Sequence, residues 1–179
     1  MRLERRDWLE FALNALAIKG YGALKAQSLA KGIGVTRGSF YWHFESLEAF
    51  NAALIDYWSE HTTERLITGV SGAGAPLEQL ERLIGQAMRS GADLERAVRS
   101  WATVDEGVAN HVARVDARRI QFAADLLAAL DVPKDEIGAR SKMLYWAAIG
   151  RLMIPFPHEN TLSDEDVTAL VALFAKRDA

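Results

Sequence analysis

Residues 25–46 read KAQSLAKGIGVTRGSFYWHFES, and this stretch predicts two short helices joined by a tight turn. Leu29 and Ile33 recur at helical spacing and predict a first helix with a narrow apolar stripe. Gly34 supplies the positive φ that a sharp turn requires. Thr36 is a good N-cap for the second helix, because its hydroxyl can accept a hydrogen bond from a free backbone N–H. The stretch therefore predicts a helix-turn-helix.

The second of these helices is expected to present a surface rich in hydrogen-bond donors and free of carboxylates. Its outward residues are Thr36, Arg37, Ser39, Tyr41, Trp42 and His43, with Gly38 allowing close approach. Such a surface is typical of a recognition helix that lies in the major groove of DNA. The alternative is a plain helical hairpin in a core, which would need no exposed donors.

The contacts of these residues can be anticipated from their chemistry. Arg37 is expected to donate two parallel hydrogen bonds to a guanine. The side chains expected at bases or phosphates are Gln27, Thr36 and Ser39, and those expected at phosphates are Tyr41, His43 and Lys25. Trp42 has two interpretations: a contact with DNA sugar and phosphate, or packing beneath the first helix of the chain.

At these residues the sequence resembles a known family. The run GVTRGSFYWHF at residues 34–44 is similar to the DNA-binding motif of the tetracycline-repressor (TetR) family of bacterial regulators, and Gly20-Tyr21, Leu29-Ala30 and Glu48 match the same pattern. The resemblance covers about residues 8–57. It implies a homodimer that binds an inverted-repeat operator on double-stranded DNA and is released from it by a small-molecule effector.

Two positions depart from the family pattern. Lys25 stands near the position where the family usually has a Ser or Thr that caps the second helix. Leu47 replaces the Lys that commonly opens the fourth helix and contacts a phosphate. Both departures concern contacts with the DNA backbone, and neither concerns the fold.

Helical periodicity continues along the chain, and no stretch alternates as a strand would. Helices are expected over about residues 5–19, 47–66, 77–90, 93–103, 108–130, 136–154 and from 164 onward. The run GVSGAGAP at residues 69–76 is expected to be a loop. The predicted fold class is all-α: a three-helix head with the helix-turn-helix in residues 1–46, and a helical ligand-binding and dimerisation bundle in residues 47–179.

The first helix is expected to pack against the helix-turn-helix through one apolar stripe, formed by Leu9, Ala12, Leu13 and Leu16. Trp8 and Phe11 lie partly off that stripe. We expect these two aromatic side chains to face the neighbouring domain.

The last two helices carry more apolar side chains than one buried face requires. The candidates for a homodimer interface are Tyr145, Ile149, Leu152, Leu170 and Phe174. In such a dimer, two helices from each subunit form a four-helix bundle, and two recognition helices reach half-sites about 34–36 Å apart. The alternative is that these residues pack within a single chain.

The helical body is also a candidate for an effector pocket, because Met and Trp make adaptable walls for an apolar cavity. The residues expected to line it are Met88, Trp101, Asp105, Phe122, Leu126, Met143 and Trp146. The polar group that orients the ligand could be Asp105, Gln121 or Arg99. Alternatively, these residues fill the core. A small apolar or amphipathic effector would weaken DNA binding, and DNA would weaken effector binding by the same factor.

Composition and charge agree with a DNA-binding head on a regulatory body. Residues 1–45 hold seven Lys or Arg against four Asp or Glu, whereas the remainder holds 14 against 20. A basic N-terminal third is favourable for binding DNA. The chain has no cysteine, which excludes disulfides and Cys-based zinc sites. Its start does not read as a signal peptide and no apolar run is long enough to span a bilayer, so we expect a cytoplasmic protein without a membrane partner.

Catalysis has little support, and no cofactor or metal is expected. The sequence offers no convergent acid, base and nucleophile, and its four histidines lack metal-binding spacing. Gly32, Gly34 and Gly38 miss the dinucleotide-binding spacing by one residue and follow a helix rather than a strand. Two other classes remain as alternatives: an effector-independent architectural DNA-binding protein, and an all-α ligand carrier or enzyme.

Overall fold

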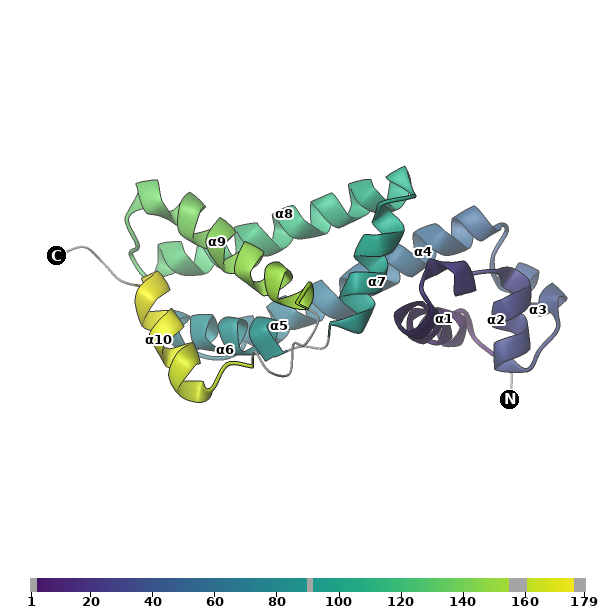
Figure 1. Cartoon of the computed structure of the whole chain (residues 1–179), viewed down its shortest axis with the longest axis horizontal. Coiled ribbons are helices and arrows are strands. Elements are labelled where there is room, and N and C mark those ends of the chain that lie inside the picture. Colours follow the sequence, from purple (N-terminus) through teal and green to yellow (C-terminus); the bar gives the residue numbers. More distant parts are fainter. Residues whose placement is uncertain (1–2, 90–91, 155–160, 176–179) are drawn as a thin grey trace. The chain divides into compact units, whose positions relative to one another are not determined.

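The computed structural model describes residues 3–89, 92–154 and 161–175, and every regular element in this part of the chain is helical. The predicted all-α fold class is therefore confirmed (Figure 1). The elements are α1 (Arg5–Lys19), a 3-10 turn η1 (Tyr21–Ala23), α2 (Ala26–Ile33), α3 (Arg37–His43), α4 (Leu47–Ser59), a π-helical segment η2 (Glu60–Glu64), α5 (Arg65–Ser71), α6 (Pro76–Arg89), α7 (Asp93–Ala102), α8 (Glu106–Ala129), α9 (Lys134–Leu152) and α10 (Asp164–Ala175).

The chain forms two compact units, each built from two separated segments. The head unit comprises Met1–Thr62 and Gly91–Ala113, and the body unit comprises Thr63–Ser90 and Arg114–Ala179. The head unit is thus larger than the segment expected to bind DNA, since it also contains α4 and α7. A functional boundary after residue 46 stays a prediction, because one compact unit can carry more than one function.

Helix α1 is the centre of the head unit, where it contacts α2, α4 and α7. It buries the predicted stripe of Leu9, Ala12, Leu13 and Leu16. Trp8 is fully buried as well, so the expectation that it faces a neighbouring domain is wrong. Its ring packs edge-on against Phe40, with 5.5 Å between the centroids. Phe11 also packs inside the head: a Cβ atom on Gly32 would lie 2.5 Å from its Cζ.

Most helix ends follow the local signals in the sequence. Gly20 ends α1 with a φ of 70°. The Ser46 hydroxyl accepts a hydrogen bond from the Ala49 N–H at 3.0 Å, which confirms Ser46 as the N-cap of α4. Thr36 does occupy the N-cap position of α3, but its side chain makes no capping hydrogen bond.

The segment after α4 differs from the expectation of one regular helix and a long loop. Helical structure continues to Ser71 and is interrupted by the π-helical turn Glu60–Glu64. The loop therefore shrinks from the expected residues 69–76 to residues 72–75. Pro76 is the first residue of α6, a position where its missing N–H costs no hydrogen bond.

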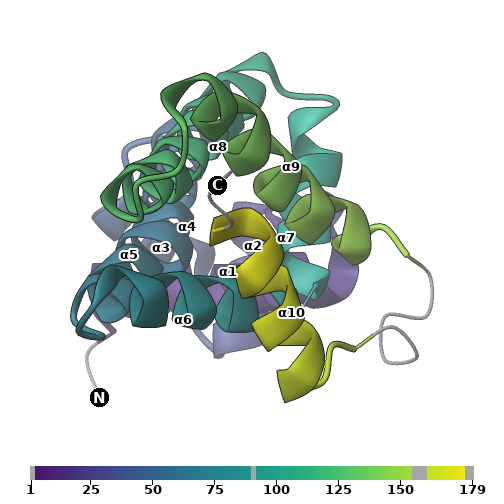
Figure 2. The same cartoon turned by 90° about the vertical axis from the view of Figure 1, so that its left-hand side faces the viewer.

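The body unit is a bundle around one apolar core. Helix α6 contacts α5, α9 and α10, and Figure 2 shows α10 lying against α6. The most deeply buried side chains of this core are Val70, Leu80, Ile84 and Leu127. None of the described helices combines the length and hydrophobicity needed to cross a bilayer.

Candidate nucleic-acid interface

The turn between α2 and α3 has the geometry that the sequence predicts. Gly34 adopts a left-handed conformation, with φ 86° and ψ 29°. Its N–H donates to the Lys31 carbonyl at 3.3 Å, and the Val35 N–H donates to the Ala30 carbonyl at 2.9 Å. This pair of hydrogen bonds is the Schellman motif, which satisfies the last carbonyls of α2. The turn is therefore fixed by the backbone, and α3 leaves α2 in a defined direction.

The inner side of α3 packs against a cluster of aromatic side chains. Phe40, on the inner side of α3, is fully buried. It contacts Phe44 at 5.3 Å and Phe50 at 5.1 Å between ring centroids, in addition to Trp8. Aromatic pairs in such edge and tilted arrangements contribute about 0.5–1.5 kcal/mol each beyond the area that they bury. Helix α3 is consequently fixed to the core of the head unit through Phe40.

The opposite face of α3 is open to solvent, together with part of α2. The exposed residues from the predicted set are Lys25, Gln27, Thr36, Arg37, Gly38, Tyr41 and Trp42, whereas Ser39 and His43 are half-buried. No Asp or Glu occurs anywhere between residues 11 and 44. The exposed surface is thus made of donors and cations, which favours contact with a polyanion.

Two members of this surface form a pair. The Nη2 atom of Arg37 donates a hydrogen bond to the Tyr41 hydroxyl at 3.2 Å. The guanidinium also lies over the Tyr41 ring, 5.4 Å from its centroid. Arg37 is a permanent cation, as arginine side chains are in proteins, and the hydrogen bond to Tyr41 raises its pKa further above the ordinary value.

The two open interpretations of Trp42 are separated by its exposure. Its side chain is 77% exposed, so it does not pack beneath the first helix. His43 lies closer to the core: its ring is 6.3 Å from that of Trp8 and 6.4 Å from that of Phe44. Trp42 is therefore accessible to a binding partner. The imidazole of His43 is half-buried, so only part of its ring is accessible.

The two departures from the family pattern have clear structural positions. Lys25 is the N-cap residue of α2, and its side chain makes no capping hydrogen bond. Leu47 is the first residue of α4 and is half-buried. Two further exposed donors on α2, Ser28 and Lys31, were missed by the sequence analysis. Their exposure could have been predicted from the sequence, because Leu29 marks the buried face of α2 and the helical period places Ser28 and Lys31 away from that face.

The predicted pocket residues are divided between the two compact units, and those of the body unit are divided between its core and its surface. Met88, Phe122 and Leu126 are buried in the core of the body unit. Met143 and Trp146 are 56% and 58% exposed, and they lie on the outer side of α9. The other two predicted residues, Trp101 and Asp105, belong to the head unit.

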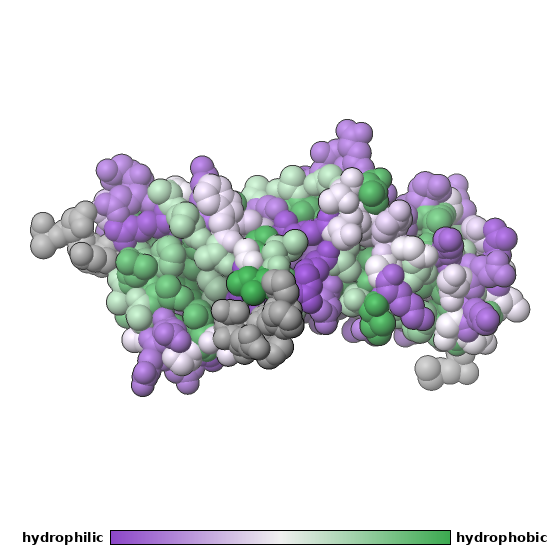
Figure 3. All heavy atoms as spheres, viewed as in Figure 1, coloured by the Kyte–Doolittle hydropathy of each residue, from purple (hydrophilic) through white to green (hydrophobic). Residues whose placement is uncertain are grey.

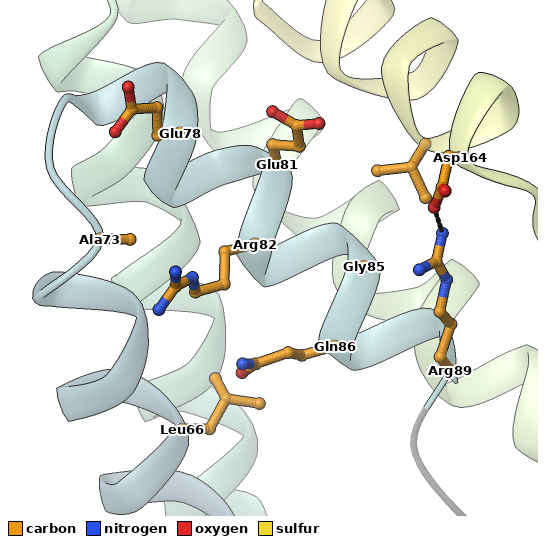
Figure 4. A pocket seen from close by; sticks show the side chains of 10 residues that line it. Leu66, Ala73, Glu78, Glu81, Arg82, Gly85, Gln86, Arg89 and Asp164 are labelled. Carbon is orange, nitrogen blue, oxygen red and sulfur yellow. Dashed lines mark hydrogen bonds and ion pairs between the residues drawn. The ribbon is translucent and has the colours of Figure 1, made fainter.

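The body unit does have an open hollow on another surface. It measures about 900 Å³ and is lined by α5, α6 and α10. Figure 4 shows Arg82 and Gln86 of α6 extending toward Leu66 of α5, while Arg89 forms an ion pair with Asp164 of α10 at 2.5 Å. Half of the ten residues that line this hollow are charged, whereas the sequence analysis expected an apolar pocket.

Of the five predicted interface residues, one is buried and four are half-buried. Leu152 is only 6% exposed, so it is removed from the set of interface candidates. Leu170 and Phe174 pack partly against the core of the body unit. Tyr145 is half-buried, and its hydroxyl donates a hydrogen bond to Asp116. Ile149 is also half-buried.

The outward face of α9 carries a different apolar set. Met143, Trp146, Ala147 and Gly150 are all exposed and follow the i, i+3, i+4, i+7 spacing of one helix face. On α10, Leu173 is 63% exposed. Figure 3 shows hydrophobic side chains gathered over α9 and α10. We call Met143, Trp146, Ala147 and Gly150 the outer stripe of α9.

Comparison with known proteins gives both a local and a global likeness. Residues 9–54 match the model of a family described as bacterial regulatory proteins, tetR family. Over 67 residues the chain is 34% identical to YuxN of Bacillus subtilis (strain 168), described as an uncharacterized HTH-type transcriptional regulator. That segment is 37% of this chain and spans only 23% of the length of this relative.

Solved structures are similar over nearly the whole chain. One is from Rhodococcus sp. and is described as a transcriptional regulator of the TetR family; it has a TM-score of 0.70 and 19% identity, covering 94% of this chain and 95% of that one. Another, from Saccharomonospora viridis, is described as a transcriptional regulator in complex with choline. It has a TM-score of 0.76 and 16% identity, covering 95% and 94%. At these identities the likeness is one of fold.

Proposed function

We propose that this chain acts as a homodimeric repressor, released from an inverted-repeat operator by a small molecule. The match of residues 9–54 to the model of bacterial regulatory proteins, tetR family, supports this proposal. The single observation that carries sequence-specific DNA binding is the exposed face of α3. It combines donors and a permanent cation, lacks carboxylates, and is backed by the aromatic cluster around Phe40. A helix of this kind fits the major groove.

Within the proposed complex, Arg37 reads a guanine. Its guanidinium is exposed at the first turn of α3 and matches the two acceptors of guanine in the major groove. Gln27, Thr36 and Ser39 supply further contacts to bases or phosphates. Lys25, Tyr41 and His43 contact phosphates, and Trp42 lies against the sugar-phosphate backbone. Phosphate contacts set the position of the protein on the duplex, while base contacts select the sequence.

The proposed dimer forms through the outer stripe of α9 together with Leu173 of α10. This apolar surface is exposed in the single chain, and exposed apolar surfaces of soluble proteins commonly mark interaction sites. Antiparallel pairing of α9 and α10 with those of a second copy would form a four-helix bundle. Twofold symmetry then matches the inverted repeat of the operator.

The effector is proposed to be a small apolar or amphipathic molecule bound in the body unit. The choline held by the Saccharomonospora viridis protein supports a small-molecule ligand for this fold, although choline itself is a hydrophilic cation. A second candidate, a regulator without an effector, is favoured by Met88, Phe122 and Leu126, which fill the body core. A library of small molecules added to the protein–operator complex separates the two: release by one compound supports the first, and release by none supports the second.

DNA binding is tested by selection from random duplexes at about 150 mM salt, followed by sequencing of the retained DNA. The expected result for the wild type is one enriched inverted repeat. For Arg37→Ala at the same salt concentration, the enriched sequences should be less specific. Retention that depends on salt but enriches no sequence would favour an architectural protein. Failure to retain DNA at any salt would contradict the proposal.

A further inference from the structure

Arg37 stands at a position that its own helix disfavours. It is the first residue of α3, and the first turn of this helix contains no acidic residue. A helix N-terminus carries a partial positive charge, so a cation there is destabilised. Residues that break a local rule of this kind are often functional. The compensating contact is with Tyr41, one turn further along the same helix.

Tyr41 is itself held by the core of the head unit. Its ring packs edge-on against that of Phe40, with 5.3 Å between centroids. Phe40 is fully buried and contacts Trp8, Phe44 and Phe50. Tyr41 nevertheless remains 44% exposed. A continuous series of contacts therefore runs from the buried cluster through the Tyr41 ring to the Arg37 guanidinium.

The geometry leaves Arg37 fully able to bind a base. A guanidinium has five N–H donors, and the hydrogen bond from Nη2 to the Tyr41 hydroxyl uses one of them. Four donors remain, and a guanine needs two. Arginine loses considerable rotamer freedom when it binds, and a side chain already held in place loses less of it at that moment. The Tyr41 O–H meanwhile stays available to donate to a phosphate.

We propose that Tyr41 is a positioning residue that orients Arg37 for guanine recognition, so that part of the sequence specificity depends on a side chain that reads no base. The inference rests on the DNA-binding function proposed above. It differs from the sequence-based expectation for Tyr41, in which a phosphate contact affects all DNA sequences equally. A positioning role instead affects the guanine preference at one position of each half-site.

The test compares the wild type with Tyr41→Phe, Arg37→Ala and the double variant, using the operator obtained by selection and the same operator with that guanine replaced. The wild type is expected to prefer guanine by roughly five- to hundredfold. Tyr41→Phe keeps the ring but removes the hydroxyl, and should reduce this preference roughly two- to tenfold. In the Arg37→Ala background, Tyr41→Phe should leave the base preference unchanged.

A matched control is Tyr21→Phe, because Tyr21 is similarly exposed, at 49%, but lies in η1 outside the recognition helix. It should leave the guanine preference intact. Circular dichroism should show the same helical content for all variants, since every substituted side chain is exposed. A Tyr41→Phe protein that binds all sequences more weakly with its guanine preference intact would overturn the inference. A wild-type protein that selects no sequence would overturn the proposed function itself.

Discussion

At the scale of single residues, two glycines in the helix-turn-helix have different physical roles. Gly32 in α2 lies against the Phe11 ring: a Cβ atom there would lie 2.5 Å from Cζ of Phe11, so the ring would have to move. Gly38 in α3 has room for a methyl group: the nearest atom would be the Thr36 Oγ1 at 3.7 Å. Glycine within a helix costs about 1 kcal/mol relative to alanine. The described chain does not need a glycine at position 38 for packing, and we predict that Gly38 allows the close approach of DNA.

Gly38→Ala should therefore raise the free energy of unfolding by about 0.5–1 kcal/mol and weaken operator binding. Gly32→Ala is the matched comparison, and it should lower the free energy of unfolding because Phe11 must move. Urea unfolding measures the first quantity, and fluorescence anisotropy with labelled operator measures the second. A Gly38→Ala protein that binds operator as tightly as the wild type would refute the close approach.

At the scale of elements, α1 and α4 are joined by a small polar network. The Arg6 Nε donates to Glu10 at 2.7 Å, and the Tyr57 hydroxyl donates to the same carboxylate oxygen at 2.9 Å. The hydrogen bond from Arg6, followed by that from Tyr57, lowers the pKa of Glu10. Burial and the hydrogen bond to Glu10 raise the pKa of Tyr57. The network therefore joins α4, which follows α3 in the chain, to α1.

This network predicts a pH dependence of stability. Because the pKa of Glu10 is lower in the folded state, the unfolded chain takes up the proton first as the pH falls. The stabilisation from Glu10 is thus complete above the ordinary glutamate pKa of about 4.3 and is lost as the pH falls through the lower folded value. Urea unfolding should show the largest difference between wild type and Glu10→Gln at pH 7, shrinking toward pH 3.5.

Tyr57→Phe provides the comparison for that measurement. It removes only the second donor to Glu10, so its pH-dependent difference from the wild type should have the same direction and a smaller size. If the difference between wild type and Glu10→Gln grew as the pH fell, the assigned direction of the Glu10 pKa shift would be refuted.

The π-helical segment is the element with the weakest signal in the sequence. In a π-turn the regular pairing of backbone carbonyls is interrupted, and here polar side chains bind carbonyls of the preceding turn. The Thr62 hydroxyl donates to the Trp58 carbonyl at 2.8 Å, and the His61 Nδ1 lies 3.1 Å from the Tyr57 carbonyl. Thr63 is buried, and its hydroxyl accepts a hydrogen bond from the Arg119 Nε at 2.9 Å. Such side-chain bonds to the backbone compete with the regular α-helix.

At the scale of the whole molecule, the outer stripe of α9 predicts the oligomeric state. Trp146→Glu places a charge in the proposed interface and should convert the dimer to a monomer, because a buried unpaired charge is strongly unfavourable. Its 58% exposure means that the single chain should still fold. Analytical ultracentrifugation measures the change, and operator affinity should fall because two linked heads bind more tightly than one.

Val104→Glu is the matched control for the dimer. Val104 is 61% exposed, lies outside α9 and α10, and receives the same charge. This variant should sediment as the wild type does. A Trp146→Glu protein that remains dimeric would exclude the outer stripe from the interface.

The sequence by itself determined the properties that depend on local chemistry. Helical periods, the turn glycine Gly34 and the cap Ser46 act over a few residues, and the all-α fold and most helix ends agree with them. The exposed face of α3 could be predicted from the sequence in the same way. Once Phe40 is placed on the buried side of this short helix, the hydrogen-bond donors fall on the exposed side. The tetR-family pattern lies in this same stretch.

Only the tertiary structure decided which apolar side chains are buried and which are exposed. Hydrophobic attraction has no direction, so a helix such as α9 with apolar groups on several faces does not indicate which face is covered. Leu152 turned inward, while Met143 and Trp146, expected in a pocket, turned outward. Trp8 was buried by Phe40, a partner far away in the sequence. Which apolar side chains are buried depends on contacts between segments far apart in the sequence, and local sequence patterns do not reveal those contacts.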